Sequence, residues 1–300
     1  MASIDPRERP NTRRLYFASL FAAAVALILV RFLLFPNKSN LSTIESTTAQ
    51  LLDGLISATI AAAAVGVGYV LFVLQDDKIK VEHLPAREIR EELDRAARSS
   101  REWRIKARTA SYFTRCLLPV LLNKNGSIQV KIQMLDPQID SLMNQYAAFR
   151  SSHPDAALWS SDRVRHEICS SILLLAIYAN RYPRLDVDIR LSSAFWVLSI
   201  DCTEDRIYIC GQNKGDAALV FRKGTEFFEH FMDDFDATFA LSRTIRPQIN
   251  GFTLENLNRE LTLANRIAVT NMYNALGFST LSDADIDEIV QTARSKHHYN

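Results

Sequence analysis

The sequence predicts a membrane α-helical hairpin, then a cytoplasmic α/β layered domain, and finally a helical appendage at the C-terminus. Three observations lead to this fold class. Two long apolar runs lie near the N-terminus, at residues 15–35 and 55–74. Between residues 102 and 243, segments that alternate with a period of two, as strands do, follow segments with helical periodicity. Residues 244–300 contain only polar, helix-forming segments, which predict the appendage.

Each apolar run is long enough to cross a bilayer core of about 30 Å, because a helix rises about 1.5 Å per residue. The first run carries a single charge, Arg31, near its end, and the second carries none. The tail at residues 1–14 and the segment at residues 75–101 are rich in Lys and Arg, whereas the loop at residues 36–54 contains only Lys38. The positive-inside rule therefore predicts two passes, with both termini in the cytoplasm and a short external loop.

Small residues recur at every fourth position in both runs. They are Ala18, Ala22 and Ala26 in the first run, and Gly54, Ala58, Ala62 and Gly66 in the second. Small side chains let membrane helices approach closely. We therefore expect these residues to pack the two helices of the hairpin together, and the same stripes could also build a homo-oligomer.

The rest of the chain divides into three parts. Residues 75–101 are expected to form a charged helical stalk, with Pro85 where the helix begins. Within residues 102–243, strands are expected at 103–107, 128–135, 185–191 and 217–222, and helices at 112–123, 138–150, 161–182 and 225–242. The stretch at residues 195–213 reads as two more strands around an acidic turn. In the appendage, helices are expected at 254–276 and 283–295, the second capped by Ser282.

Residues 102–243 resemble the phospholipase D-like superfamily, in its degenerate single-copy branch. The resemblance rests on three motifs in the same order. The first is Leu118-Pro119 before a strand that ends in Leu135-Asp136-Pro137, and the second is the Arg165-His166-Glu167-Ile168 opening of a long helix. The third combines the strand with Ile200-Asp201, the turn Gly211-Gln212-Asn213 and the Phe-rich run from Gly224 to Phe235. Active members of that family carry His-x-Lys-x-x-x-x-Asp, in which the His attacks phosphorus and the Lys neutralises the phosphoryl oxygens.

The catalytic His and Lys of that motif are missing here. Counting back from Asp201 leads to Ala194 and Trp196, and counting back from Asp205 leads to Leu198 and Ile200. An aliphatic side chain cannot act as a nucleophile. The sequence therefore predicts no catalytic residue and favours a protein that is not an enzyme.

Four polar residues are candidates for ligand binding near the degenerate cleft. They are Asp136, Asp201, Asn213 and Asp216. The alternative is that Asp136 belongs to a turn and residues 213–216 to a surface loop. An acidic row on the helix at 225–242 (Glu226, Glu229, Asp233 and Asp236) is more typical of a solvated face or of pairing with basic residues than of a metal site. No metal and no cofactor is expected.

The charge balance gives no overall signal for a nucleic-acid or acidic partner. The 35 Lys and Arg balance the 34 Asp and Glu, and no sequence-specific nucleic-acid-binding motif is present.

The overall layout resembles the membrane effectors of bacterial anti-phage systems, of the retron type or the cyclic-oligonucleotide type. This resemblance implies a non-catalytic toxin of the bacterial inner membrane that permeabilises the lipid bilayer and causes growth arrest or death. It also implies control by a partner encoded nearby, either a reverse transcriptase–RNA/DNA complex or a nucleotide signal. Two alternatives stay open: a membrane-anchored phosphodiesterase or nuclease with an altered site, and a membrane-tethered ligand sensor or scaffold.

Overall fold

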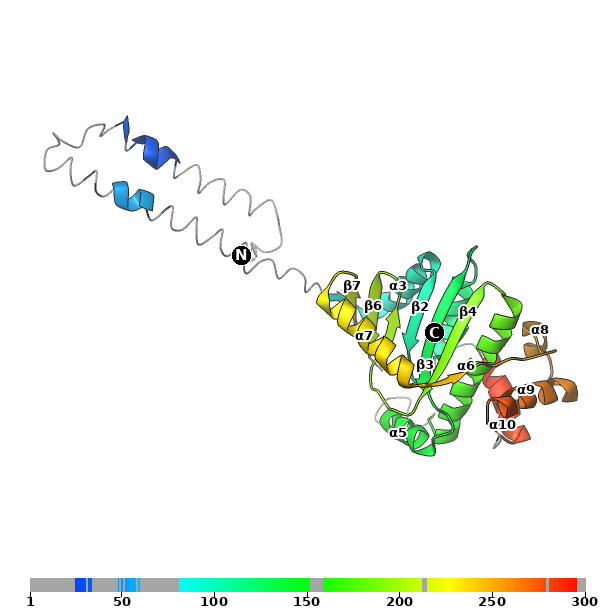
Figure 1. The fold of residues 1–300 in the computed structure, drawn as a ribbon. Helices are drawn as coiled ribbons and strands as arrows, with labels where there is room; N and C mark the ends of the chain where they lie inside the picture. Colours follow the sequence, from blue (N-terminus) through cyan, green and yellow to red (C-terminus); the bar gives the residue numbers. More distant parts are fainter. Residues whose placement is uncertain are drawn as a thin grey trace. The chain divides into compact units, whose positions relative to one another are not determined.

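The computed structural model describes residues 25–30, 32, 33, 48, 50, 52–57, 59, 81–151, 159–211, 215–278 and 281–295. The chain divides into two compact units, Met1–Lys78 and Ile79–Asn300 (Figure 1). In the first unit, the described residues include two short helical stretches, at 25–30 and 52–57.

The predicted membrane hairpin is contradicted by the helices that the structure describes. Among the described residues, no helix combines the length and the apolar character needed to cross a membrane. Most of residues 15–35 and 55–74 lie outside the described residues, as do Ala18, Ala22, Ala58, Ala62 and Gly66 of the small-residue stripes. Ala26 and Gly54 are described and exposed. The two-pass inner-membrane localisation depended on this hairpin and is wrong on the same finding.

The second unit is built on a mixed sheet of eight strands among the described residues, in the order β1-β7-β6-β5-β2-β3-β4-β8 (Figure 1). The strands are β1 (Val81–Leu84), β2 (Glu102–Lys106), β3 (Ile128–Leu135), β4 (Leu185–Ser192), β5 (Ser199–Cys202), β6 (Arg206–Cys210), β7 (Ala218–Arg222) and β8 (Arg243–Ile245). Strands β2, β3 and β4 are parallel, and the remaining pairs are antiparallel. The unit is therefore an α/β domain.

Several of the helices begin at a residue whose side chain caps them. The helical elements are α3 (Ala86–Ser99), the π-helix η4 (Phe113–Leu117), α4 (Leu118–Leu121), α5 (Asp140–Arg150), α6 (Ser161–Arg181), α7 (Glu226–Leu241), α8 (Leu254–Leu257), α9 (Leu263–Ala275) and α10 (Asp283–Arg294). Ser160, Thr225 and Ser282 each accept a hydrogen bond from the backbone N–H three residues later, at the starts of α6, α7 and α10. The N-cap predicted at Ser282 is thus present.

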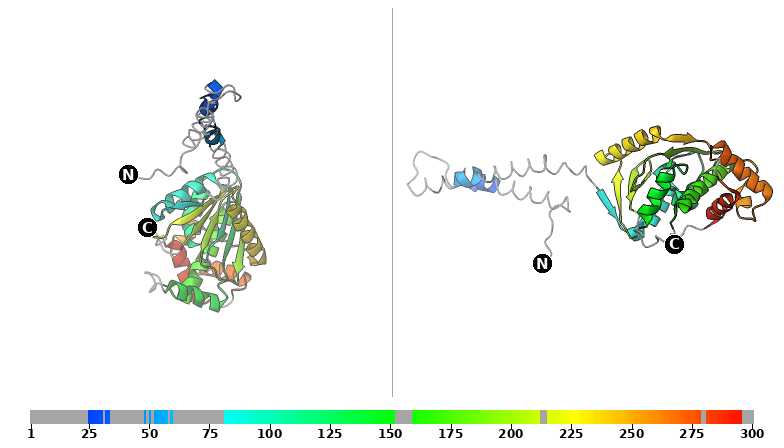
Figure 2. Two further views of the ribbon diagram at one scale, coloured as in Figure 1. Left: turned by 90° about the vertical axis from the view of Figure 1, so that its left-hand side faces the viewer. Right: turned by 90° about the horizontal axis from the view of Figure 1, so that it is seen from below.

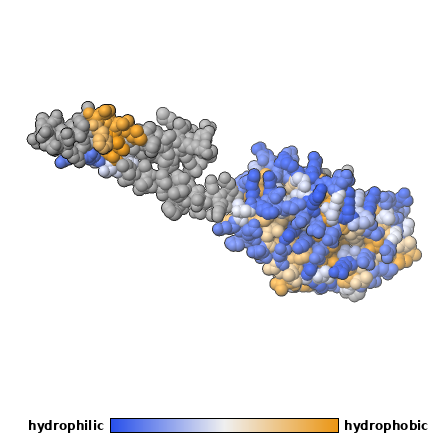
Figure 3. Space-filling model, turned by 45° about the horizontal axis from the view of Figure 1, so that its top comes forward, coloured by the Kyte–Doolittle hydropathy of each residue, from blue (hydrophilic) through white to orange (hydrophobic). Residues whose placement is uncertain are grey.

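Helices α6 and α7 cover opposite faces of the sheet (Figure 2). The α6 face holds the main core, into which β3 contributes Ile128, Val130, Ile132 and Met134, all buried. On the α7 face, Phe228 packs with a smaller set of apolar strand residues. The exposed side chains of the second unit are largely hydrophilic on the side drawn in Figure 3, with apolar areas among them.

The described part of the segment predicted as a solvated stalk, residues 81–101, lies within this unit. Residues Val81–Leu84 pair with β7 as an edge strand, and Leu93, Ala96 and Ala97 of α3 are buried in the main core. These three small or branched side chains are the buried contacts through which α3 packs on the core.

The predicted appendage also packs on the core of the unit. The Tyr273 hydroxyl donates to the Cys169 carbonyl at 2.6 Å, and His166 Nε2 lies 2.9 Å from Asp285 Oδ1. Both contacts join the C-terminal helices to α6.

The acidic side of α7 faces basic residues of the sheet. Arg104 donates to both carboxylate oxygens of Asp236 at 2.9 Å, and Lys106 donates to Asp234 at 3.0 Å. At these positions the carboxylates therefore pair with side chains of β2.

Candidate functional site

A cavity of about 300 Å³ lies at the carboxyl end of β2. Strands β3 and β4 lie on one side of β2 in the sheet. The next strand along the chain, β5, lies on the other side of β2, so the strand order reverses at β2. In α/β sheets, ligands bind at the carboxyl ends of strands where the strand order reverses in this way. The volume is at the lower end of the range of about 300–1,000 Å³ for small-molecule sites.

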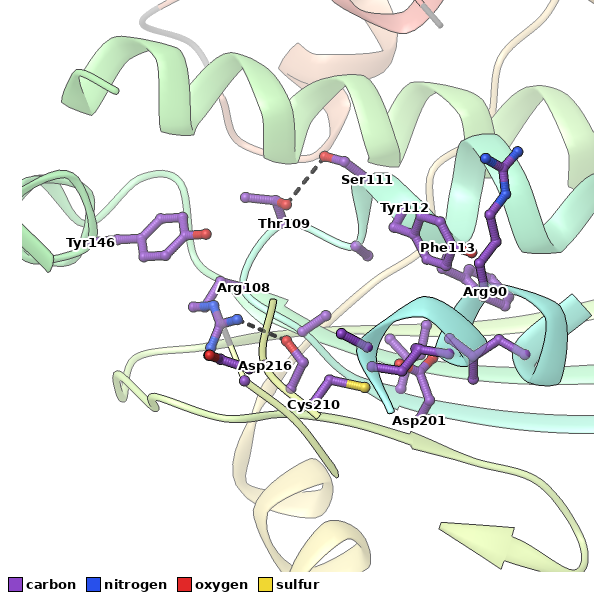
Figure 4. A pocket seen from close by; sticks show the side chains of 18 residues that line it. Arg90, Arg108, Thr109, Ser111, Tyr112, Phe113, Tyr146, Asp201, Cys210 and Asp216 are labelled. Carbon is purple, nitrogen blue, oxygen red and sulfur yellow. Dashed lines mark hydrogen bonds between the residues drawn. The ribbon is translucent and has the colours of Figure 1, made fainter. Parts of the chain in front are cut away.

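The wall of the cavity combines apolar and polar side chains from segments far apart in the sequence (Figure 4). Helix α3 contributes Ile89 and Leu93, and β2 contributes Ile105. The loop between β2 and η4, residues 107–112, supplies several of the polar side chains, and Tyr146 of α5 adds an aromatic ring. Such a lining, mostly apolar with a few placed polar groups, is typical of a small-molecule site.

Asp201 is the buried carboxylate of this cavity. On the α6 face its side chain stands between Ile105 of β2 and Tyr208 of β6, its register partners. It is 9% exposed, and its Oδ1 accepts a hydrogen bond from Trp103 Nε1 at 3.0 Å. The period of two in β5 places Ser199 and Asp201 on this face, whereas Ile200 and Cys202 pack on the opposite side.

Burial raises the pKa of Asp201 from 3.8 to about 6, and the hydrogen bond from Trp103 lowers it in part. Among the described residues, burial and this hydrogen bond account for the shifted pKa of Asp201, and no basic side chain there contributes a counter-charge. A buried acid in a cavity with a perturbed pKa is a marker of functional sites.

Arg108 is fixed at the other end of the cavity. Its side chain is buried, Nη2 donates to Ser199 Oγ at 2.8 Å, and Nη1 donates to the Val197 carbonyl. Its guanidinium carbon lies 5.6 Å from the centre of the Tyr146 ring. Figure 4 shows the side chain of Asp216 beside this guanidinium.

The loop that carries Arg108 is held to α6 through a buried ion pair. Ser111 Oγ donates to Glu167 Oε2 at 2.6 Å, and the same carboxylate accepts from Arg115 at 3.0 Å and from Arg163 at 3.1 Å. Between these contacts Ala110 has a φ of 54°, which is unusual for a residue other than glycine. The loop then enters the π-helix η4, a geometry found frequently at functional sites.

The cavity offers little that could act as a nucleophile. Burial raises the pKa of the Cys210 thiol to about 12 and also raises the pKa of the Tyr112 hydroxyl, so both keep their protons at neutral pH. A protonated thiol is a poor nucleophile. The described lining contains no histidine that could act as a base.

Two of the four residues predicted for ligand binding line this cavity, namely Asp201 and Asp216. Asn213 lies outside the described residues. Asp136 lies at the end of β3, where it accepts hydrogen bonds from Arg243 at 3.0 Å and from the Gln138 backbone N–H at 3.1 Å. These contacts describe an ion pair and a turn.

Sequence reasoning missed Arg108, Tyr112 and Tyr146. One signal could have found Arg108, because it follows closely after β2, where α/β sheets place ligands. In the described residues, no group of three or more His, Cys, Asp or Glu side chains is arranged to hold a metal ion.

The comparisons with known proteins do not identify a family for this chain. No family model matches the chain, and no curated protein matches it. The solved structures that match include TrmBL2, an archaeal chromatin protein described as showing a novel mode of DNA binding. The match has a TM-score of 0.30 and 8% sequence identity, and it covers 67% of this chain and 69% of that chain. A likeness at that level supports no conclusion about this protein.

The resemblance to the phospholipase D-like superfamily is contradicted, because no family model matches and the structural match is this distant. The likeness to retron-type or cyclic-oligonucleotide-type effectors falls with it, since that likeness also depended on the membrane hairpin.

Proposed function

We propose that the unit Ile79–Asn300 is a non-catalytic ligand-binding domain, which binds a small polar molecule in the cavity around Asp201. The observation that supports this most directly is the carboxylate itself. It is buried, it faces the cavity, and the hydrogen bond from Trp103 occupies only one of its two oxygens. A carboxylate has about four acceptor sites, so capacity remains for a ligand.

The energetic cost of Asp201 supports a role beyond packing. A pKa raised from 3.8 to about 6 corresponds to about 3 kcal/mol of unfavourable free energy when the carboxyl is ionised. A neutral side chain at this position would avoid that cost. Charged groups placed this unfavourably are concentrated at functional sites.

Catalysis is the second possibility, and the cavity supports it less well. A carboxyl with a pKa of about 6 could serve as a general acid or base near neutral pH. A reaction also needs a nucleophile or a second titrating group within reach. Cys210 and Tyr112 are protonated, and the hydroxyls of Ser111 and Ser199 already bind Glu167 and Arg108.

The loop at residues 107–112 gives binding a route to the rest of the domain. It lines the cavity on one side and contacts Glu167 of α6 on the other. Because His166, the residue before Glu167, contacts Asp285 of α10, a ligand that orders this loop would also affect the C-terminal helices. A sensor of a small molecule therefore fits this geometry. Permeabilisation of a membrane by an effector of anti-phage defence stays a prediction from the sequence.

The test is a ligand screen with a cavity-filling variant. Small organic cations, anions and neutral polar compounds are added to the 300-residue chain, and the thermal midpoint is measured. A compound that binds the folded state raises the midpoint. We expect Ala107→Phe, which places a ring in the cavity, to abolish the shift.

The matched control is Ala237→Phe, because Ala237 is exposed on α7 at the opposite face of the sheet. It should leave the shift unchanged. If no compound shifts the midpoint, or if the shift survives in Ala107→Phe, the proposal fails.

A further inference from the structure

We propose that the ligand carries a cationic nitrogen with N–H donors, as a primary ammonium or an amidinium does, and that this group binds the carboxylate of Asp201. This inference rests on the proposed function of the cavity.

The first argument is that the basic side chains of the cavity are directed elsewhere. Arg108 donates to Ser199 Oγ and to the Val197 carbonyl. Ser199 and Asp201 are two residues apart on one face of β5, which separates them by about 6.5 Å along the strand. Figure 4 shows the guanidinium of Arg90 pointing away from Asp201.

Arg104 completes this set, since it lies on the strand next to Asp201. Its register partner is Cys202, whose side chain lies on the α7 face, and it donates to Asp236 of α7. It therefore stands on the opposite side of the sheet from the cavity. The counter-charge that Asp201 lacks within the described protein can come from a ligand, since buried charges are ordinarily paired.

The second argument is the chemistry around the carboxylate. Trp103 donates to Oδ1 and fixes the orientation of the carboxylate, and Tyr112 and Phe113 line the same cavity. Aromatic faces attract cations. The apolar side chains of Ile89 and Leu93 also line the cavity, and a charge-assisted N–H···O hydrogen bond is stronger in apolar surroundings than in water. A carboxylate with aromatic and apolar walls thus suits a small organic cation better than an anion.

The experiment compares three compounds that share one ring. Binding of benzylamine, benzyl alcohol and benzoate to the 300-residue chain is measured by isothermal titration calorimetry at about pH 8, where Asp201 is ionised. We expect benzylamine to bind at least about tenfold more tightly than either analogue, as losing a hydrogen bond between charged groups implies. Asp201→Asn should remove most of that preference, because Asn keeps an acceptor for Trp103 but carries no charge.

Asp234→Asn is the matched control. Asp234 pairs with Lys106 at an exposed site on α7, so its replacement should leave the preference intact. The inference is overturned if benzyl alcohol or benzoate binds as tightly as benzylamine, or if Asp201→Asn leaves the affinity for benzylamine within about threefold.

Failure of this inference can be told apart from failure of the proposed function. If an anionic or neutral compound of the screen binds in a way that Ala107→Phe abolishes, while benzylamine does not bind, the cavity is a ligand site and the ligand class is wrong. If no compound of either set binds, both proposals fail.

Discussion

Replacing Asp201 by Asn should stabilise the domain at neutral and alkaline pH. Substitutions that remove a buried acid usually destabilise proteins when that acid has a charged partner. Here the described partner is the indole N–H of Trp103, which an Asn side-chain oxygen can also accept. The substitution therefore removes an unpaired charge and keeps the hydrogen bond.

The magnitude follows from the pKa of the carboxyl. Burial raises it from 3.8 to about 6, a difference of about two units, and each unit corresponds to about 1.36 kcal/mol. The ionised carboxylate of Asp201 thus costs the folded state about 3 kcal/mol. We expect the free energy of unfolding of Asp201→Asn to exceed that of the wild type by about 1–3 kcal/mol at pH 8.

The sign of the pH dependence is fixed by the same shift. Between about pH 4 and about pH 6, the folded state binds more protons at Asp201 than the unfolded state does. The free energy of unfolding therefore falls as the pH rises through this window. The advantage of Asp201→Asn should be absent near pH 4 and complete above about pH 7.

Urea denaturation followed by tryptophan fluorescence measures this effect, since Trp103 is fully buried. Asp136→Asn is a matched control with the opposite expected sign, because Asp136 is paired with Arg243 and loses that ion pair. A variant Asp201→Asn that is less stable than the wild type at both pH 4.5 and pH 8 would refute the reasoning, since it would reveal a stabilising partner of the carboxylate.

Three further predictions concern the loop beside the cavity and the helices on the two faces of the sheet. Glu167→Gln should lower the free energy of unfolding in urea by about 3–5 kcal/mol, because it leaves Arg115 buried without its counter-charge, and a loss below about 1 kcal/mol would contradict a buried ion pair. Ala110→Gly should raise the thermal midpoint by the equivalent of up to about 1 kcal/mol, since glycine adopts a φ of 54° without strain, and a lower midpoint would argue against that strain. Thr225→Ala should lower the stability of the folded state by about 1 kcal/mol, because α7 loses its N-cap, and the same thermal assay measures this loss. Thr225→Ser should keep most of the stability, because serine also caps helices.

The elements with strong local patterns could be predicted from the sequence. The strand expected at residues 128–135 is β3, and the helices expected at 161–182 and 225–242 are α6 and α7 to within a residue at either end. In each case the pattern of apolar and polar residues within the segment is sufficient to predict its structure. Strict alternation marks β3, and capped apolar stripes mark the two helices.

Elements that depend on distant partners could not be predicted in this way. Strand β1 has four residues and exists because it pairs with β7, whose residues lie far along the chain. The three residues of β8 pair with β4 in the same manner. Helix α3 reads as a solvated charged helix, because its buried side is narrow and carries two alanines.

The candidate site was predictable only in part, for the same reason. Asp201 could be singled out, since an acid in an apolar strand is conspicuous in a sequence. Its relation to Arg108 and Tyr146 is set by the pairing of β2 with β5 and by the packing of α5, neither of which is written in a local pattern. The error in the membrane hairpin came from a local pattern. It was inferred from the length and apolar character of two runs alone, and no described helix is long and apolar enough to cross a membrane.

The most direct test is the titration of the Asp201 carboxyl itself, followed by ¹³C NMR on the labelled 300-residue chain with and without saturating benzylamine. We expect a pKa of about 6 in the free protein, and a fall of at least about one unit when the cation is bound, because a bound positive charge favours the ionised carboxylate. A carboxyl that titrates near 3.8 in the free protein, or whose pKa does not move when benzylamine is added, would contradict the assignment of Asp201 as the group that binds the ligand.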